Sequence, residues 1–342
     1  MRTVDERVRE LRRLLEAARR VYEKRHELVP SLARTTGLSP QGVLLGFESL
    51  ERDATDAQLR ALVESAGDAA HVHVILSANV FVGALRALAF ARAAAARVTI
   101  RPSPRDPILT EALVDAANDP GVLLTSERDP RESDADRIDV YGGAAAIEQV
   151  RERARPGVSV RAHGPGLGVA FVTRAADPAD AAPWLAEDVV VFDQRGCLSP
   201  RVVLVEGDAA RAERFAGALH ASLDEWAVRV PRGTLAEEER AEARRWQEAL
   251  AFAGRTWSGS QHAVGLGERL LVPPTGRHVQ VLPAADALRA SELLAPIAGA
   301  IVTMGSDDPE QVRHVAPPHA RLATLGQMQR PPLDGPVDRR PT

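Results

Sequence analysis

The 342-residue chain has one cysteine, few aromatic residues and no excess of basic charge. Its single cysteine, Cys197, excludes an intramolecular disulfide. With 43 Lys and Arg against 47 Asp and Glu, the net charge of −4 provides no overall positive field to hold nucleic acid. No apolar run approaches the roughly 18 residues of a membrane span, and the densely charged residues 1–25 do not resemble a signal peptide. These absences favour the reducing cytoplasm, where a reactive thiol stays reduced.

What the sequence does have is regular hydrophobic periodicity. Apolar residues recur at helical spacing over 4–25 and predict an amphipathic helix, and further helices are expected at 39–50 and 56–66. From residue 71 onward, strands and helices alternate. The expected strands are 71–77, 98–100, 122–125 and 138–141, and the expected helices are 80–95, 107–118 and 144–153. Such alternation predicts a parallel, doubly wound sheet, which binds ligands beyond the carboxyl ends of its strands.

A second α/β block is expected to begin near residue 188. Its strands are predicted at 201–205, 269–273, 278–282 and 299–303, and its helices at 209–226 and 235–253. We therefore predict an α/β fold of two doubly wound domains. The division is an N-terminal helical segment (1–68), a dinucleotide-binding domain (69–187), a catalytic domain (188–315) and a C-terminal arm or tail (316–342). The tail is rich in proline and arginine, a composition that fits either an extended arm or a disordered segment.

Cys197 stands in a segment suited to presenting a thiol. An apolar run at 189–192 precedes it, Gly196 leaves space beside the sulfur, and a second apolar run follows at 202–205. A nucleophile between two strands would be held on a rigid frame and open to a cleft. The alternative is a core cysteine, because free cysteine is among the most buried residue types.

Seven ordered segments between about residues 70 and 330 give the chain a family resemblance. They are Ser77-Ala78-Asn79-Val80, Ile100-Arg101-Pro102-Ser103, Tyr141-Gly142-Gly143, His163-Gly164-Pro165-Gly166-Leu167-Gly168, Asp193-Gln194-Arg195-Gly196-Cys197-Leu198-Ser199-Pro200, Glu292-Leu293-Leu294-Ala295-Pro296 and 324–332. Together they resemble the aldehyde dehydrogenase superfamily, and within it the acyl-CoA reductase branch typified by the LuxC-like fatty acyl reductases. Short glycine motifs are weak alone, and the weight lies in their order.

The resemblance implies that Cys197 is the nucleophile and that Asn79 donates its side-chain amide to the oxyanion. A helical turn over 193–199 would favour the thiolate, and Arg195 is a nearby cation of undefined direction. Asn79 could equally be an ordinary helix-cap asparagine. Oxidising members of the superfamily have a water-activating glutamate where this chain has His163, so its loss fits a reductase. His163 could protonate the nascent alkoxide or serve only the structure.

The same resemblance implies a nicotinamide cofactor. Arg101 and Ser103, at the end of a strand, would contact the adenosine ribose. An arginine at that place favours NADPH over NADH, although a solvated charge is the alternative. Gly142 and Gly143 would let the backbone approach the pyrophosphate, or else form a simple turn. Glu292 would accept hydrogen bonds from the nicotinamide ribose, or else be an ordinary residue opening a helix.

We therefore predict an NAD(P)H-dependent oxidoreductase that converts a fatty acyl thioester, carried by CoA or by an acyl-carrier protein, to the aldehyde through a thioacyl-Cys197 intermediate. The alternatives are an aldehyde-oxidising or acyl-phosphate-reducing member of the superfamily, and a non-catalytic partner that retains the fold. Related enzymes associate through a C-terminal arm, so a homo-oligomer is one expectation. No His or Cys spacing in the sequence indicates a metal site.

Overall fold

The structure is a computed structural model that describes residues 2–78, 80–127 and 129–340. Four helices open the chain: α1 (Val4–Glu23), α2 (Arg25–Thr36), α3 (Pro40–Phe47) and α4 (Asp56–Ala66). The N-termini of α1 and α4 are closed by capping boxes, Thr3 with Glu6 and Thr55 with Gln58. Helix α2 was not predicted, whereas the other three begin within one residue of the sequence expectation.

Five parallel strands form the first sheet, in the order β3-β2-β1-β4-β5. Its elements along the chain are β1 (Ala69–Ile75), α5 (Gly83–Ala94), β2 (Ala95–Arg101), α6 (Ile108–Ala117), β3 (Val122–Leu124), β4 (Arg137–Tyr141), α7 (Ala144–Arg153) and β5 (Ser159–His163). The predicted alternation is confirmed here, except that β5 was missed. All five carboxyl ends meet at one edge, and β1 at the centre separates β2 from β4, as in doubly wound folds.

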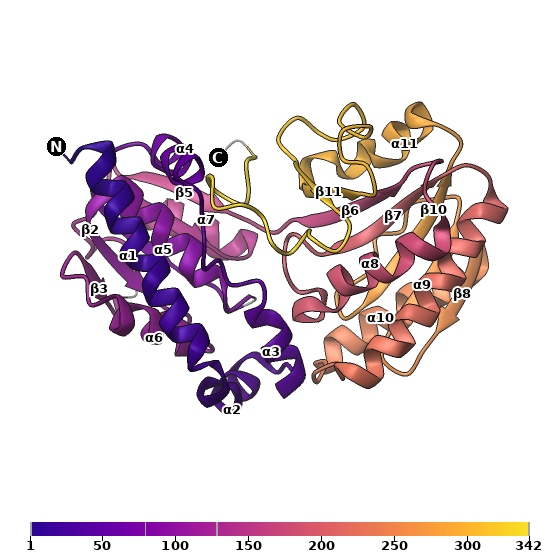
Figure 1. The fold of residues 1–342 in the computed structure, drawn as a ribbon, viewed down its shortest axis with the longest axis horizontal. Helices are drawn as coiled ribbons and strands as arrows, with labels where there is room; N and C mark the ends of the chain where they lie inside the picture. The colour runs from indigo at the N-terminus through magenta and orange to yellow at the C-terminus, as the bar shows by residue number, and fades with distance from the viewer. Residues whose placement is uncertain (1, 79, 128, 341–342) are drawn as a thin grey trace.

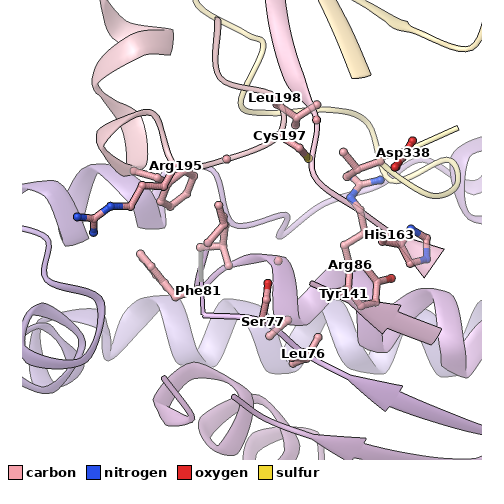
Figure 2. A pocket seen from close by; sticks show the side chains of 18 of the residues that line it. Leu76, Ser77, Phe81, Arg86, Tyr141, His163, Arg195, Cys197, Leu198 and Asp338 are labelled. Carbon is pink, nitrogen blue, oxygen red and sulfur yellow. The ribbon is translucent and has the colours of Figure 1, made fainter. Parts of the chain in front are cut away.

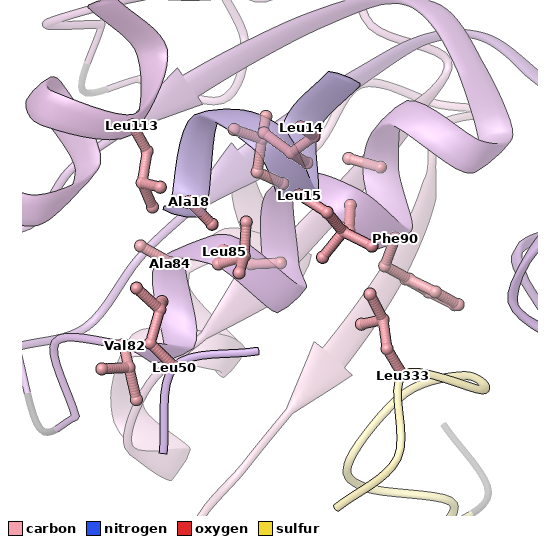
Figure 3. Close-up of a cluster of buried hydrophobic side chains, with 14 of the residues drawn as sticks. Leu14, Leu15, Ala18, Leu50, Val82, Ala84, Leu85, Phe90, Leu113 and Leu333 are labelled. Carbon is pink, nitrogen blue, oxygen red and sulfur yellow. The ribbon is translucent and has the colours of Figure 1, made fainter. Parts of the chain in front are cut away.

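Helices α1, α5 and α6 pack together beside this sheet (Figure 1). Their buried residues form one core, in which Leu14 and Leu15 of α1 pack with Leu85 of α5 and Leu113 of α6 (Figure 3). Leu333, from the C-terminal part of the chain, lies in the same cluster. The N-terminal helices therefore belong to the first α/β unit, and the tail returns to that unit.

The second sheet has seven strands in the order β12-β11-β6-β7-β10-β9-β8, all parallel except the β8–β9 pair. Its elements are β6 (Leu167–Val172), α8 (Pro178–Val190), η1 (Val191–Gln194), β7 (Pro200–Glu206), α9 (Ala209–Arg229), α10 (Glu237–Ala253), β8 (Gly254–Ser258), β9 (Ala263–Gly267), β10 (His278–Ala284), α11 (Ala287–Leu294), η2 (Ala295–Ala300), β11 (Ile301–Ser306) and β12 (Arg321–Thr324). The α/β class with two parallel sheets is thus confirmed.

Three expectations for this half differ from the structure. The strand predicted at 269–273 is absent among the described residues, and β8 and β9 supply that edge of the sheet. The apolar run before Cys197 ends helix α8 and enters the 3-10 turn η1, so the cysteine does not follow a strand. The chain passes from the first sheet to the second at 164–166, between β5 and β6, whereas the second domain was placed from residue 188. The domain limits remain a proposal.

The C-terminal segment, described to residue 340, runs back across the molecule between the two sheets (Figure 1). The guanidinium of Arg86 donates hydrogen bonds to the carbonyls of Pro331, Pro332 and Gly335, and it pairs with Glu51 at 2.6 Å. The tail was expected to be either an extended arm or a disordered segment. Its described part fits the extended arm, and this arm packs against its own chain. Within the described residues, no helix combines the length and the apolar character needed to cross a bilayer.

Candidate active site

A cavity of about 380 Å³ lies where the two sheets face each other, and Cys197 is one of its lining residues. The carboxyl ends of the first sheet contribute Leu76, Ser77 and the Tyr141–Gly143 segment to its wall. The C-terminal segment contributes Gln329 and Asp338 (Figure 2). The thiol therefore opens toward the strand ends at which a doubly wound sheet binds its ligands.

The loop before Cys197 is held in a strained conformation. Phe192, Asp193 and Gln194 all have positive φ, at 56°, 50° and 65°, a region that side chains other than glycine rarely adopt. Buried polar contacts maintain it. The Gln194 amide donates to the carbonyls of Pro200 and His278 at 2.7 Å, and its oxygen accepts from the His278 N–H at 2.9 Å. The amide thus fixes the loop to β7 and β10.

Asp193 is the second anchor of this loop. Its carboxylate forms an ion pair with Arg277 at 2.7 Å, with both side chains 1% exposed, and it accepts a hydrogen bond from the N–H of Gly233. The Asp-Gln pair that marks the cysteine motif in the sequence therefore shapes the loop. Neither side chain is among the residues that line the cavity.

Strand β6 approaches the cysteine loop through Gly168. A Cβ at this position would lie 2.3 Å from the carbonyl oxygen of Leu198, so the backbone contact requires glycine. The same strand end carries the His163–Gly166 turn into the cavity wall. The His163-Gly-Pro-Gly-Leu-Gly motif thus serves two purposes, one in packing against the loop that carries Cys197 and one in lining the pocket.

His163 stacks on Tyr141 with ring centroids 4.2 Å apart, and its Nε2 is buried without a hydrogen-bond partner. Burial lowers the pKa of His163 to about 4, so the imidazole is neutral near pH 7. A neutral imidazole can accept or donate a hydrogen bond but cannot act as a pre-charged acid. Sequence reasoning did not identify Tyr141 as a pocket residue, although it directly precedes the glycine pair.

The Cys197 thiol is not activated by its surroundings. Its pKa is raised to about 11, chiefly by burial and then by the carboxylate of Asp338, while the guanidinium of Arg340 acts in the opposite direction. The backbone at Cys197 does favour the thiolate, as expected, but desolvation of the sulfur outweighs this contribution. Arg195 gives no help either. Its guanidinium points away from the sulfur and donates to the carbonyls of Thr36 and Thr234 (Figure 2).

The carboxylate of Asp338 is positioned by Arg340, which pairs with it at 2.6 Å and also donates to the carbonyls of Gly164 and Pro165. The C-terminal segment is thereby attached to the turn that follows His163. Figure 2 shows Asp338 on this segment, beside the strand and loop that carry His163 and Cys197. A carboxylate in this position was not foreseen, because more than 100 residues separate it from both partners in the sequence.

Removing the charge of Asp338 is expected to activate the thiol. In Asp338→Asn the repulsion between carboxylate and thiolate disappears and Arg340 loses its partner, so the pKa of Cys197 falls. Alkylation by iodoacetamide at about pH 8 should then accelerate by up to ~10-fold, the equivalent of one pKa unit. Asp334→Asn, on the same segment, is the control for displacement of the tail. An equal acceleration in both variants would contradict the electrostatic explanation.

The other predicted residues lie at different distances from this cavity. Gly142 and Gly143 line it, whereas Arg101 and Ser103 end the neighbouring strand β2 and begin the loop after it, outside the lining set. Glu292 is exposed near the carboxyl end of α11, where it pairs with Arg289 at 3.0 Å, and it does not line the cavity. The sequence alternative, in which Glu292 is an ordinary residue that opens a helix, therefore also differs from the structure. Asn79 lies outside the described residues.

The residues at the sheet edge fit a nicotinamide dinucleotide. Gly143 begins helix α7 without any side-chain cap, so amide N–H groups at the helix start remain available for a pyrophosphate. A Cβ at Gly143 would meet nothing within 4 Å, which shows open space beside this backbone. Arg101, Leu76 and Gly142 follow adjacent strands in the order β2-β1-β4 and could contact successive parts of one extended ligand.

Three comparisons with known proteins agree with this arrangement. The family model described as acyl-CoA reductase (LuxC) matches residues 126–331. The long-chain acyl-protein thioester reductase of Aliivibrio fischeri is 28% identical over 120 residues, which is 35% of this chain and 25% of that protein. The match thus spans a quarter of the curated relative.

Solved structures of aldehyde dehydrogenases share the fold. An NAD-dependent benzaldehyde dehydrogenase from Corynebacterium glutamicum superposes with a TM-score of 0.68 at 17% identity, covering 94% of this chain and 81% of that one. An NADP-dependent glyceraldehyde-3-phosphate dehydrogenase from Bacillus halodurans, solved with NADP, gives 0.66 at 15% identity, covering 96% and 80%. At these identities the likeness establishes the fold alone.

Proposed function

The chain belongs to the LuxC acyl-CoA reductase family, and from this premise we propose that it reduces a fatty acyl thioester to the aldehyde with a nicotinamide cofactor. The observation that carries the proposal is the shared cavity: Cys197 lines the same space as Gly142 and Gly143, which precede the uncapped start of α7. The resemblance at Arg101 favours NADPH over NADH. The proposed substrate is an acyl group on CoA or on an acyl-carrier protein.

The chain's own residues would perform the covalent half of the reaction. The Sγ of Cys197, once deprotonated, attacks the thioester carbonyl, and the carrier leaves as its thiolate, so that an acyl-S-Cys197 bond replaces the bond to the carrier. A bound reduced nicotinamide would supply the hydride. Collapse of the resulting hemithioacetal releases the aldehyde and returns the sulfur to its starting state. Because the departing group is a thiolate in both steps, neither departure requires a strong acid.

The environment of Cys197 suits a reductase in one further respect. By the resemblance, this chain has His163, neutral near pH 7, where oxidising members of the superfamily have a water-activating glutamate. Tyr141 and His163, stacked together, occupy that part of the cavity wall. We propose that the stacked rings exclude water from that side of the thioacyl group. We propose that His163 orients the carbonyl or packs against it without acting as an acid.

The test is a turnover assay with product identification. Purified chain, long-chain acyl-CoA and NADPH should consume reduced nicotinamide and yield the fatty aldehyde in equal amounts, with the aldehyde trapped as a hydrazone and identified by mass spectrometry. Acyl-carrier protein, acyl phosphate, and aldehyde with oxidised cofactor are parallel arms. Turnover only in the acyl-phosphate or oxidation arm would replace the proposal. Failure to bind either nicotinamide cofactor by calorimetry would indicate a non-catalytic protein that retains the fold.

A further inference from the structure

A second cluster of ligand-type side chains lies on the catalytic half of the chain, outside the cavity of Cys197. His220 and Asp224 stand one turn apart on helix α9, and His262 directly precedes strand β9. None of the three is among the residues that line the cavity. The sequence did not reveal the group because 37 residues, including α10 and β8, lie between Asp224 and His262.

The three side chains converge closely enough to share one ion. One donor atom from each lies within 4.8 Å of the others. His220 Nε2 is 3.4 Å from one oxygen of Asp224, and His262 Nδ1 is 3.9 Å from the other. Ligands placed 2.0–2.2 Å from a tetrahedral zinc ion lie about 3.3–3.5 Å apart, so the donor atoms stand near this spacing and the side chains must rotate to complete the site.

The buried member of the cluster has a nitrogen without a partner. The His262 side chain is 1% exposed, and its Nδ1 makes no hydrogen bond. Its other nitrogen, Nε2, lies 2.9 Å from Nδ1 of His220. A buried polar atom aimed at a carboxylate just beyond hydrogen-bond distance is unusual, because such groups are nearly always satisfied. An ion between Nδ1 and Asp224 would satisfy it.

The backbone closes around this point. A Cβ on Gly259 would lie 2.2 Å from His262 Cε1 and 2.7 Å from Asp224 Oδ1, so the chain approaches the cluster as only glycine permits. Gly259 also donates its N–H to the carbonyl of His262 at 3.1 Å, which fixes the turn. Asp224 is about half exposed and leaves the cluster open to solvent on one side.

We propose that His220, Asp224 and His262 bind one Zn²⁺ ion, with water as the fourth ligand. Two imidazoles and a carboxylate are a donor set that zinc prefers. The ion would join helix α9 to the turn between β8 and β9 and so stabilise this edge of the second sheet. Binding through Nε2 of His220 and Nδ1 of His262 places a proton on each of the two facing nitrogens, so the more exposed ring of His220 turns away as the ion enters.

The test is a metal titration of the full chain after dialysis against a chelator. Calorimetry should give one equivalent of Zn²⁺, and Co²⁺ should produce the visible absorption of a four-coordinate ion. Asp224→Asn and His262→Gln should each weaken binding by at least ~100-fold, since even residues behind the ligands change affinity 10–100-fold. Zn²⁺ should raise the melting temperature of the wild type and not that of Asp224→Asn.

Two controls separate this site from adventitious binding. His314→Gln removes an exposed histidine elsewhere and should leave the affinity unchanged. Cys197→Ala removes a thiol, a group that can also bind zinc, and this variant should still bind one equivalent of Zn²⁺. Asp224 is surface-exposed, so Asp224→Asn is expected to fold even if His262→Gln does not. Undiminished Zn²⁺ binding in Asp224→Asn, or its loss in Cys197→Ala, would overturn the proposal, as would the absence of binding in the wild type.

Discussion

Aldehyde formation is expected to fall by roughly 10⁴-fold or more when Cys197 is replaced by alanine, because removing the nucleophile of a covalent mechanism removes a whole reaction path. Intact-protein mass spectrometry measures the same step directly. After incubation with a long-chain acyl-CoA and no cofactor, the wild type should gain the mass of one acyl group, and Cys197→Ala should gain none. Because the chain has no other cysteine, Cys197 is the single thiol that the acyl group can modify.

The alanine variant should fold normally, because the side chain is only partly enclosed and the loop is held by its neighbours. Unchanged calorimetric binding of the nicotinamide cofactor is the control for the integrity of the cavity. The acylation rate of the wild type should rise with pH toward the thiol pKa of about 11, since burial holds the thiol neutral at lower pH. An acyl adduct that persists in Cys197→Ala would show that another side chain is acylated and would contradict the proposal that Cys197 is the nucleophile.

The first sheet was predictable from the sequence for a physical reason. In β1 and β4 the buried apolar residues recur at every second position, as at Val72 and Val74, and this strand pattern alternates clearly with helices. The same rule failed for 189–192. An apolar run of four residues is compatible with either a buried strand or a buried helix end. Here it continues α8 into a turn that contacts of Asp193 and Gln194 help to maintain.

The motifs pointed to the Cys197 loop and the glycine turn, which line one cavity, but not to the groups that face them. Asp338 acts on Cys197 from a segment 141 positions away along the chain, and Arg86 holds that segment from a position near the first sheet. Contacts of such long separation leave no periodic signal. Glu292 shows a different limit of motif matching. Its motif occurs in the expected order along the chain, but the order does not determine the direction of the Glu292 side chain, which pairs with Arg289 outside the cavity.

The ion pair between Arg277 and Asp193 gives the second large expected effect. Both side chains are 1% exposed, and Arg277 also donates to the carbonyl of Val230 at 2.8 Å. Arg277→Met, similar in length but uncharged, would leave the carboxylate of Asp193 buried without its ion-pair partner. Breaking a buried pair from one side typically costs about 3–5 kcal/mol in the free energy of unfolding. Urea denaturation at neutral pH measures that loss.

The matched control is Arg289→Met, which breaks the exposed pair with Glu292 and should change the free energy of unfolding by less than about 1 kcal/mol. A second measurement connects stability with the site. Because Asp193 belongs to the positive-φ run that leads to Cys197, loosening it should also slow acylation of the thiol under conditions where Arg277→Met is still folded. If Arg277→Met were as stable as the control and acylated at the wild-type rate, the strained loop would owe its shape to Gln194 alone.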